Sequence, residues 1–133
     1  MWLFKIDANG NQVWQVPKSG TVANLPLAGW WVCRGVDNGY IVVGNSTAIT
    51  KGFIDTVHGG MDIWMAKIDE NGNLIWNHEF GGTQDDIPYF VSGTIDGGYL
   101  ITGSTNSFNI DVTKYQASGD IWVIKTDASG KMQ

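Results

Sequence analysis

Two neighbouring carboxylates are the first residues whose types could do chemistry in this chain of 133 residues. Asp85 and Asp86 carry the acidic groups that general acid–base catalysis uses. Adjacent residues of an extended segment point in opposite directions, however, so the two carboxyl groups would not meet at one substrate atom. We therefore expect Asp85 and Asp86 to be solvated turn residues, with ligand binding as the alternative.

Two neighbouring tryptophans offer a different chemistry. Trp30 and Trp31 carry flat apolar rings that, beside Asn, Asp and Thr, can stack on sugars. Because the two residues are adjacent on an expected strand, their side chains should face opposite sides, so that one of them is exposed. We interpret the pair primarily as core, with a sugar-binding role as the alternative.

The acidic turns and the histidines do not form a persuasive metal site. Residues 7–11 (DANGN) and 69–73 (DENGN) look like calcium loops, but a full calcium site needs about six to eight oxygens. The third copy at 127–131 (DASGK) places a cation in the loop, so aspartates that cap their own turns explain the repetition better, with calcium as the open alternative. His58 and His78 lack metal-ligand spacing. We expect no metal, cofactor or catalytic group.

The chain repeats a hairpin motif three times. The motif reads MWLFKIDANGNQVWQ from Met1, DIWMAKIDENGNLIWN from Asp62 and DIWVIKTDASGKMQ from Asp120. A second motif alternates with it and reads DNGYIVVGNST from Asp37 and DGGYLITGST from Asp96. Repetition at a fixed period predicts stacked supersecondary units, none of which can bury its apolar faces alone.

Alternation of apolar residues and turn residues predicts four strands in each repeat. In the second repeat they are 63–69, 74–76, 89–95 and 99–102. The turn at Gly72 should be a three-residue loop with the glycine in the left-handed conformation. That loop sets Ala66 opposite Trp76 and Ile68 opposite Leu74.

The second hairpin of each repeat is expected to turn through two residues. Gly97–Gly98 and Asn38–Gly39 are the residue types that the primed two-residue turns require. Both hairpins of a repeat would then belong to one antiparallel sheet.

Four antiparallel strands in about 60 residues, apolar on both faces, are typical of a β-propeller blade. A β-sandwich, the alternative, would show one polar face on each strand. The repeats predict an all-β chain with blade-like units at 1–61 and 62–119, and an incomplete third repeat at 120–133 that adds one C-terminal strand. Two blades cannot close a ring, for which about four to eight are needed.

The paired motifs resemble the β-propeller repeats of secreted and cell-surface proteins of bacteria and archaea. In those repeats a D-x-W-x-x-K-x-D-x-x-G hairpin alternates with a D-G-G-Y-x-x-x-G-x-T hairpin, and the likeness covers nearly the whole chain. The first repeat departs from it, because PKSGTVANLPLAGW stands where the second has GGTQDDIPY. The resemblance implies a propeller fold and an extracellular or cell-surface location, and it transfers no catalytic residue.

Composition excludes several classes of partner. A net charge of −5 argues against nucleic acid and anionic membranes. No apolar run approaches the ~20 residues that span a bilayer, so membrane insertion is not expected. The start of the chain lacks the basic region of a signal peptide. Cys33 is the only cysteine, which rules out a disulfide within the chain.

We therefore expect a non-catalytic propeller-repeat module for assembly or protein binding. The alternatives are a lectin-like propeller that binds a glycan and, less favoured, part of a propeller enzyme whose site lies elsewhere. The expected partners are further copies of the chain or further blades of a longer one, which would cover outer faces that include Trp2, Phe4, Ile121 and Val123. The expected core tryptophans are Trp2, Trp14, Trp64, Trp76 and Trp122.

Overall fold

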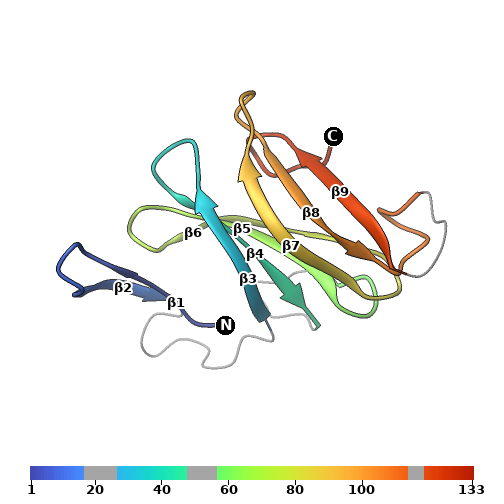
Figure 1. The fold of residues 1–133 in the computed structure, drawn as a ribbon, viewed down its shortest axis with the longest axis horizontal. Helices are drawn as coiled ribbons and strands as arrows, with labels where there is room; N and C mark the ends of the chain where they lie inside the picture. Colours follow the sequence, from blue (N-terminus) through green and yellow to red (C-terminus); the bar gives the residue numbers. More distant parts are fainter. Residues whose placement is uncertain (17–26, 48–56, 114–118) are drawn as a thin grey trace.

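The computed structural model describes residues 1–16, 27–47, 57–113 and 119–133. Those residues form β-strands and no helix, which confirms the predicted all-β class (Figure 1). The strands are β1 (Leu3–Ile6), β2 (Gln12–Val16), β3 (Leu27–Arg34), β4 (Tyr40–Ser46), β5 (Asp62–Ile68), β6 (Leu74–Phe80), β7 (Asp86–Gly93), β8 (Tyr99–Thr105) and β9 (Asp120–Thr126).

The strands of the described residues pair in chain order into three antiparallel sheets. The first sheet is β1-β2, the central sheet is β3-β4-β5-β6, and the last sheet is β7-β8-β9. The central sheet joins the two sequence repeats, because β4 of the first repeat pairs with β5 of the second from Ser46↔Asp62 to Tyr40↔Ile68. The sheets are thus offset by two strands from the repeats.

The hairpin turns share one conformation. Gly72 has a φ of +83° and its N–H bonds to the carbonyl of Asp69, which confirms the predicted left-handed glycine. The predicted two-residue turns at Gly97–Gly98 and Asn38–Gly39 are wrong. Gly35 N–H donates to Gly39 O at 2.9 Å, and Asn38 has the left-handed conformation with a φ of +66°. Gly97 N–H donates to Thr94 O at 3.0 Å and Thr94 N–H donates to Gly98 O at 2.9 Å, so this loop has the same form as the loop at Gly72.

One part of the predicted β5–β6 register is confirmed and one part is wrong. Ile68 pairs with Leu74 as expected. Trp76 pairs with Lys67 instead of Ala66, because a bulge inserts Ile75 between the two pairs and shifts the ladder by one residue.

The central sheet is buried on both faces. One core cluster joins it to the last sheet through residues such as Ile63, Met65 and Ile124. The other lies on the opposite face around Trp64, with Met1 and Leu3 packed against it. Every residue of β5 is buried as a result. A strand covered from both sides needs apolar side chains on both faces, which explains the apolar run from Ile63 to Ala66.

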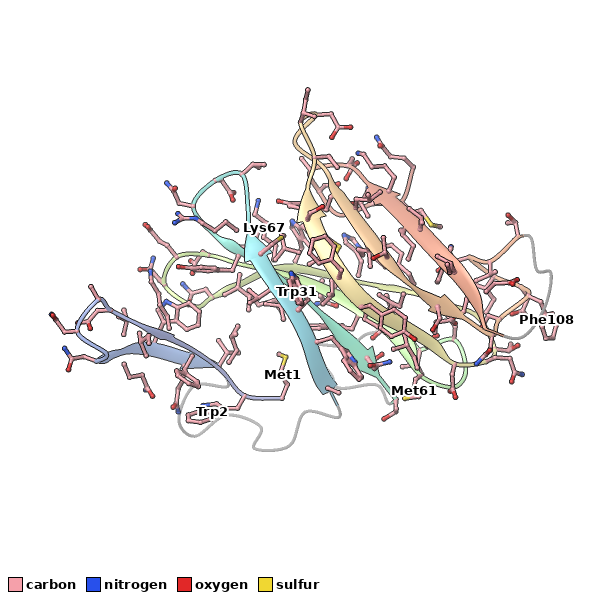
Figure 2. The ribbon with its side chains drawn as sticks, viewed as in Figure 1. Met1, Trp2, Trp31, Met61, Lys67 and Phe108 are labelled. Atoms are coloured by element: carbon pink, nitrogen blue, oxygen red, sulfur yellow. The ribbon has the colours of Figure 1, made fainter. Side chains whose placement is uncertain are left out.

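Burial of the tryptophans follows the position of each sheet in this stack. Trp64 is 0% exposed, as expected for a core residue, whereas Trp14, Trp76 and Trp122 are only partly buried. Trp2 is 62% exposed, so its predicted burial is wrong. Trp2 points away from the central sheet whereas Met1 lies between β1 and β3, and no described sheet covers the outer face of β1 (Figure 2).

Candidate functional site

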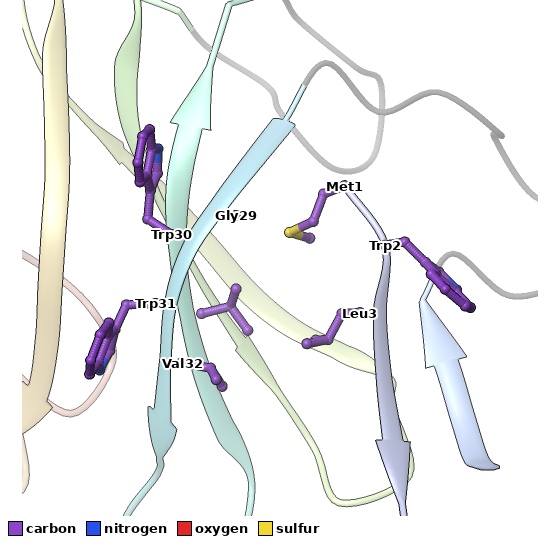
Figure 3. A pocket seen from close by; sticks show the side chains of 8 residues that line it. Met1, Trp2, Leu3, Gly29, Trp30, Trp31 and Val32 are labelled. Carbon is purple, nitrogen blue, oxygen red and sulfur yellow. The ribbon is translucent and has the colours of Figure 1, made fainter.

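Trp30 is an extra residue in the pairing of β3 with β4. Gly29 pairs with Gly44 and Trp31 pairs with Val43, so Trp30 has no partner in the ladder. Such a bulge redirects side chains, and Figure 3 shows both indole rings on the side of β3 that lies away from β1. The prediction that the two rings face opposite sides is therefore wrong. Each ring is about half exposed.

The same bulge recurs in the last sheet, where Tyr89 is the extra residue in the pairing of β7 with β8. A glycine in the partner strand makes room for each bulge. A Cβ atom on Gly44 would lie 2.0 Å from the carbonyl oxygen of Ala28, and one on Gly103 would lie 2.2 Å from that of Ile87. Only glycine allows the backbones to approach so closely.

Each bulged aromatic residue is anchored at its polar atom. Trp30 Nε1 donates a hydrogen bond to Asn45 Oδ1. In the last sheet the hydroxyl of Tyr89 shares a hydrogen bond of 2.9 Å with Ser104 Oγ. Asn45 and Ser104 each directly follow the glycine of the partner strand, so the repeat fixes the direction of both rings.

The bulges place four exposed aromatic side chains on two neighbouring strands. Trp31 and Phe90 are in contact, with ring centroids 5.1 Å apart. We call the set formed by Trp30, Trp31, Tyr89 and Phe90 the aromatic patch. Its exposed rings are suited to stacking on a flat apolar surface, such as one face of a sugar ring.

A cavity of about 370 Å³ lies between β1 and β3 (Figure 3). Met1 and Leu3 point into it from the first sheet, whereas the rings of Trp2, Trp30 and Trp31 point away. Its lining residues are Met1, Trp2, Leu3, Gly29, Trp30, Trp31, Val32 and Val42. The side chains that line the cavity are aliphatic or aromatic.

Asp86 is not a solvated turn residue, which corrects the prediction from the sequence. Its side chain is fully buried, and its Oδ2 accepts hydrogen bonds from Gly82 N–H at 2.9 Å and Ser107 Oγ at 2.8 Å. Asp85 Oδ1 accepts a bond of 2.9 Å from Met61 N–H. The Asp86 carboxyl group therefore links the connection before β7 to the residues after β8, and the Asp85 carboxyl group binds the connection before β5. Asn45, which anchors Trp30 of the aromatic patch, donates from Nδ2 to the backbone carbonyl of Asp86 at 3.3 Å.

Asp62 is a second buried carboxylate near Asp86 and was not singled out from the sequence. Asp62 Oδ2 accepts a hydrogen bond of 2.6 Å from His58 N–H, and Asp62 Oδ1 has no hydrogen-bond partner among the described residues. A Cβ atom on Gly81 would lie 2.2 Å from Asp62 Oδ1 and 2.8 Å from Asp86 Oδ2, so the two carboxyl groups converge on this glycine. Burial, and to a smaller extent the charge of Asp86, raises the pKa of Asp62.

Replacing Asp62 by asparagine should stabilise the protein more as the pH rises. The folded-state pKa of Asp62 lies above its ordinary value of 3.8, so between these two values the folded chain holds one more proton than the unfolded chain. Stability of the native protein therefore falls as pH rises through that window, and the penalty persists above it. Thermal melts of both proteins from pH 3 to 7 should show the difference in Tm, Asp62→Asn minus native, increasing with pH.

Asp127→Asn is the matched control with the opposite sign. Hydrogen bonds from Ser129 and Lys131 lower the pKa of Asp127, so its ionised form stabilises the fold above pH 3.8 and that contribution is lost in acid. The Tm difference for Asp127→Asn should therefore become more negative as pH rises. Parallel curves for the two variants would contradict the account.

The described part of the chain contains no group of three or more His, Cys, Asp or Glu side chains placed to hold a metal ion. It also contains no helix long and apolar enough to cross a membrane. The sequence matches no protein-family model and no curated protein.

Sequence reasoning missed the bulges and the buried aspartates. Gly44 and Gly103 interrupt otherwise alternating strands, and a glycine inside a strand is a signal for a bulge. Burial of Asp62 and Asp86 had no comparable signal, because it depends on how the connection at Gly81 folds back on β5 and β7.

Proposed function

We propose that this chain is a non-catalytic, propeller-type repeat module that assembles by stacking its sheets on further sheets of the same kind. It serves assembly or protein binding, outside the cell or at a cell surface. One observation carries the proposal: the two faces that pack against each other inside the chain are both exposed at its two ends.

Two names define these faces. The front face of a sheet holds Trp64, Ala66 and Ile68 in β5, and the back face holds Ile63 and Met65 in the same strand. The front face of the central sheet packs on the first sheet, and its back face packs on the last sheet. Each internal interface is therefore front against back.

The first and last sheets present the same two faces to solvent. On the first sheet the front face exposes Trp2, Phe4 and Ile6, which occupy the positions of Trp64, Ala66 and Ile68. On the last sheet the back face exposes Ile121, at 85%, and Val123. Contiguous apolar patches of this kind are uncommon on monomers, and in repeat proteins they are covered by the next unit.

Other observations support the propeller type of the module and its location outside the cell. The central sheet is a four-stranded antiparallel meander with apolar side chains on both faces, as in a propeller blade. Location outside the cell is supported by the resemblance of the repeats alone. The contacts of Asp85 and Asp86 support the non-catalytic role. Both carboxyl groups are of a type that acid–base catalysis could use, but both accept hydrogen bonds from the chain's own backbone.

The proposal predicts head-to-tail association, which light scattering coupled to size exclusion measures. The native chain should elute above the 14.5 kDa mass of one copy. Trp2→Arg removes the front-face contact and Ile121→Arg removes the back-face contact, so each variant alone should be a monomer. Mixed together they should form a dimer and nothing larger, because one intact front face and one intact back face remain.

Ile95→Arg is the matched control. Ile95 is as exposed as Ile121 but lies in the β7–β8 turn, outside both faces, so this variant should associate like the native chain. A native chain that stays at 14.5 kDa across concentrations overturns the proposal, as does a mixture of the two variants that forms no dimer.

The aromatic patch favours a second candidate function, carbohydrate binding. Two of its four exposed rings, those of Trp30 and Tyr89, are held in direction by Asn45 and Ser104. A glycan array separates this function from the first. Selective binding that Trp31→Ala removes and Phe108→Ala keeps would place the chain in the lectin class, since Phe108 is an exposed aromatic residue outside the patch.

A further inference from the structure

β1, β5 and β9 are the three copies of the strand that begins the hairpin motif. They differ in which strand lies along one of their edges. β5 pairs with β4, and β9 pairs with β8, so in both cases the second strand of the preceding hairpin occupies that edge. β1 is the third copy and pairs only with β2 among the described residues. Its other edge therefore presents backbone donors and acceptors that a strand can bind.

A repeated ion pair shows what that edge lacks. Lys67 Nζ lies 2.7 Å from Asp37 Oδ2, and Lys125 Nζ lies 2.8 Å from Asp96 Oδ2. In both cases the aspartate stands in the turn of the hairpin whose second strand pairs with the lysine strand. Lys5 is the third copy of this lysine, and it forms no ion pair with the described residues. Its Nζ lies over the ring of Tyr40 instead.

Packing behind the edge is also incomplete. Val91 on β7 is 1% exposed because the central sheet covers it, whereas its counterpart Val32 on β3 is 48% exposed. The cavity of about 370 Å³ lies beside Val32, between β3 and β1. In both Figure 1 and Figure 3, β2 lies on the far side of β1 from β3. Along β1 the described residues thus show a cavity, a strand edge without a partner strand and a lysine without an ion pair.

We propose that the open edge of β1 binds an antiparallel β-hairpin that carries Asp-x-Gly-Tyr-x-x-x-Gly, the pattern of residues 37–44 and 96–103. The pairing of β4 with β5 gives the register, in which the last glycine lies opposite Trp2 and the tyrosine lies opposite Ile6. The aspartate of the hairpin turn then pairs with Lys5. The first strand of the hairpin covers Val32 and fills the cavity.

The occupant is a hairpin whose second strand has a free edge. An intact second copy does not offer one, because β4 lies between β3 and β5, and β8 lies between β7 and β9. The inference rests on the proposed function, since it names the partner that completes the first sheet. The two interactions use different surfaces. The hairpin binds a strand edge, whereas stacking of a front face on a back face uses the faces of two sheets.

A synthetic peptide with the chain's own residues 86–105 is the probe, and fluorescence anisotropy of the labelled peptide against the whole chain measures its binding. We expect saturable binding of one peptide per chain. Lys5→Asp should weaken it by about fivefold, the upper end for an exposed charge pair, and a peptide carrying Asp96→Lys should restore binding to that variant.

Lys131→Asp is the matched control, because it makes the same charge change on an exposed turn away from β1 and should leave the affinity unchanged. Absence of saturable binding overturns the proposal, as does equal binding of a scrambled peptide or indifference to Lys5→Asp. If the peptide fails to bind while the chain still forms head-to-tail dimers, only this inference is refuted. Peptide binding by a chain that stays monomeric refutes the proposed stacking alone.

Discussion

Replacing Trp64 by alanine is expected to lower the free energy of unfolding by about 3–5 kcal/mol, the usual loss when a buried aromatic side chain is removed. Trp64 is 0% exposed and lies at the centre of the core cluster between the first and central sheets. Its neighbours Val42 and Ile68 belong to paired strands of the central sheet and cannot collapse into the space without breaking the ladder. Urea unfolding followed by circular dichroism measures the loss.

Trp2→Ala is the control for this prediction, since Trp2 occupies the same position of the motif. It is mostly exposed, so the substitution should cost about 1 kcal/mol or less in the dilute, unassembled chain. Equal losses for the two variants would contradict the assignment of the buried front face to the central sheet.

Replacing Gly44 by alanine should cost about 1–3 kcal/mol, the range for forcing extra volume into a packed site. The new Cβ atom would lie 2.0 Å from the carbonyl oxygen of Ala28, which is backbone of the neighbouring strand and cannot rotate aside. Relief requires the bulge at Trp30 to open, so the Trp30 fluorescence should also change. Thermal and urea unfolding measure the stability of the variant.

Gly93→Ala and Gly103→Ala are the control variants for Gly44→Ala. No heavy atom lies within 4 Å of a Cβ on Gly93, and its φ is not in the left-handed region, so this variant should be close to neutral. Gly103 occupies the same position of the repeat as Gly44 and meets the Ile87 carbonyl, so its variant should lose a similar amount. A harmless Gly44→Ala would show that the bulge does not depend on glycine.

Local signals in the sequence predict that the strands of the second repeat exist, but they predict the bounds less well, because the strand expected at 74–76 extends to Phe80 and the strand expected at 89–95 runs from Asp86 to Gly93. Alternation and the turn glycines predict both bounds of β5 to within one residue. The left-handed conformation of Gly72 follows from its position in a three-residue turn. Which hairpins share a sheet is not a local property. β4 and β5 pair across the boundary between repeats, and nothing in either motif distinguishes that pairing from one within a repeat.

Burial shows the same division between local and tertiary causes. Trp2 and Trp64 stand in nearly identical sequence contexts, and only the presence of a covering sheet separates an exposed ring from a buried one. Trp30 and Trp31 were interpreted mainly as core, yet each is about half exposed, and their common direction follows from a bulge that the alternation rule does not contain. Asp86 was taken for a surface residue because its partners, Gly82 and Ser107, come together only in the folded chain.

The offset between sheets and repeats determines where this polypeptide can be divided without separating paired strands. A fragment that ends after residue 61, at the boundary of the first repeat, strips β4 of the strand that pairs with it from Tyr40 to Ser46. A fragment that ends at Phe80 keeps all four strands of the central sheet. The unit that is copied along the sequence and the unit whose strands pair in one sheet are therefore different, and the second begins half a repeat later than the first.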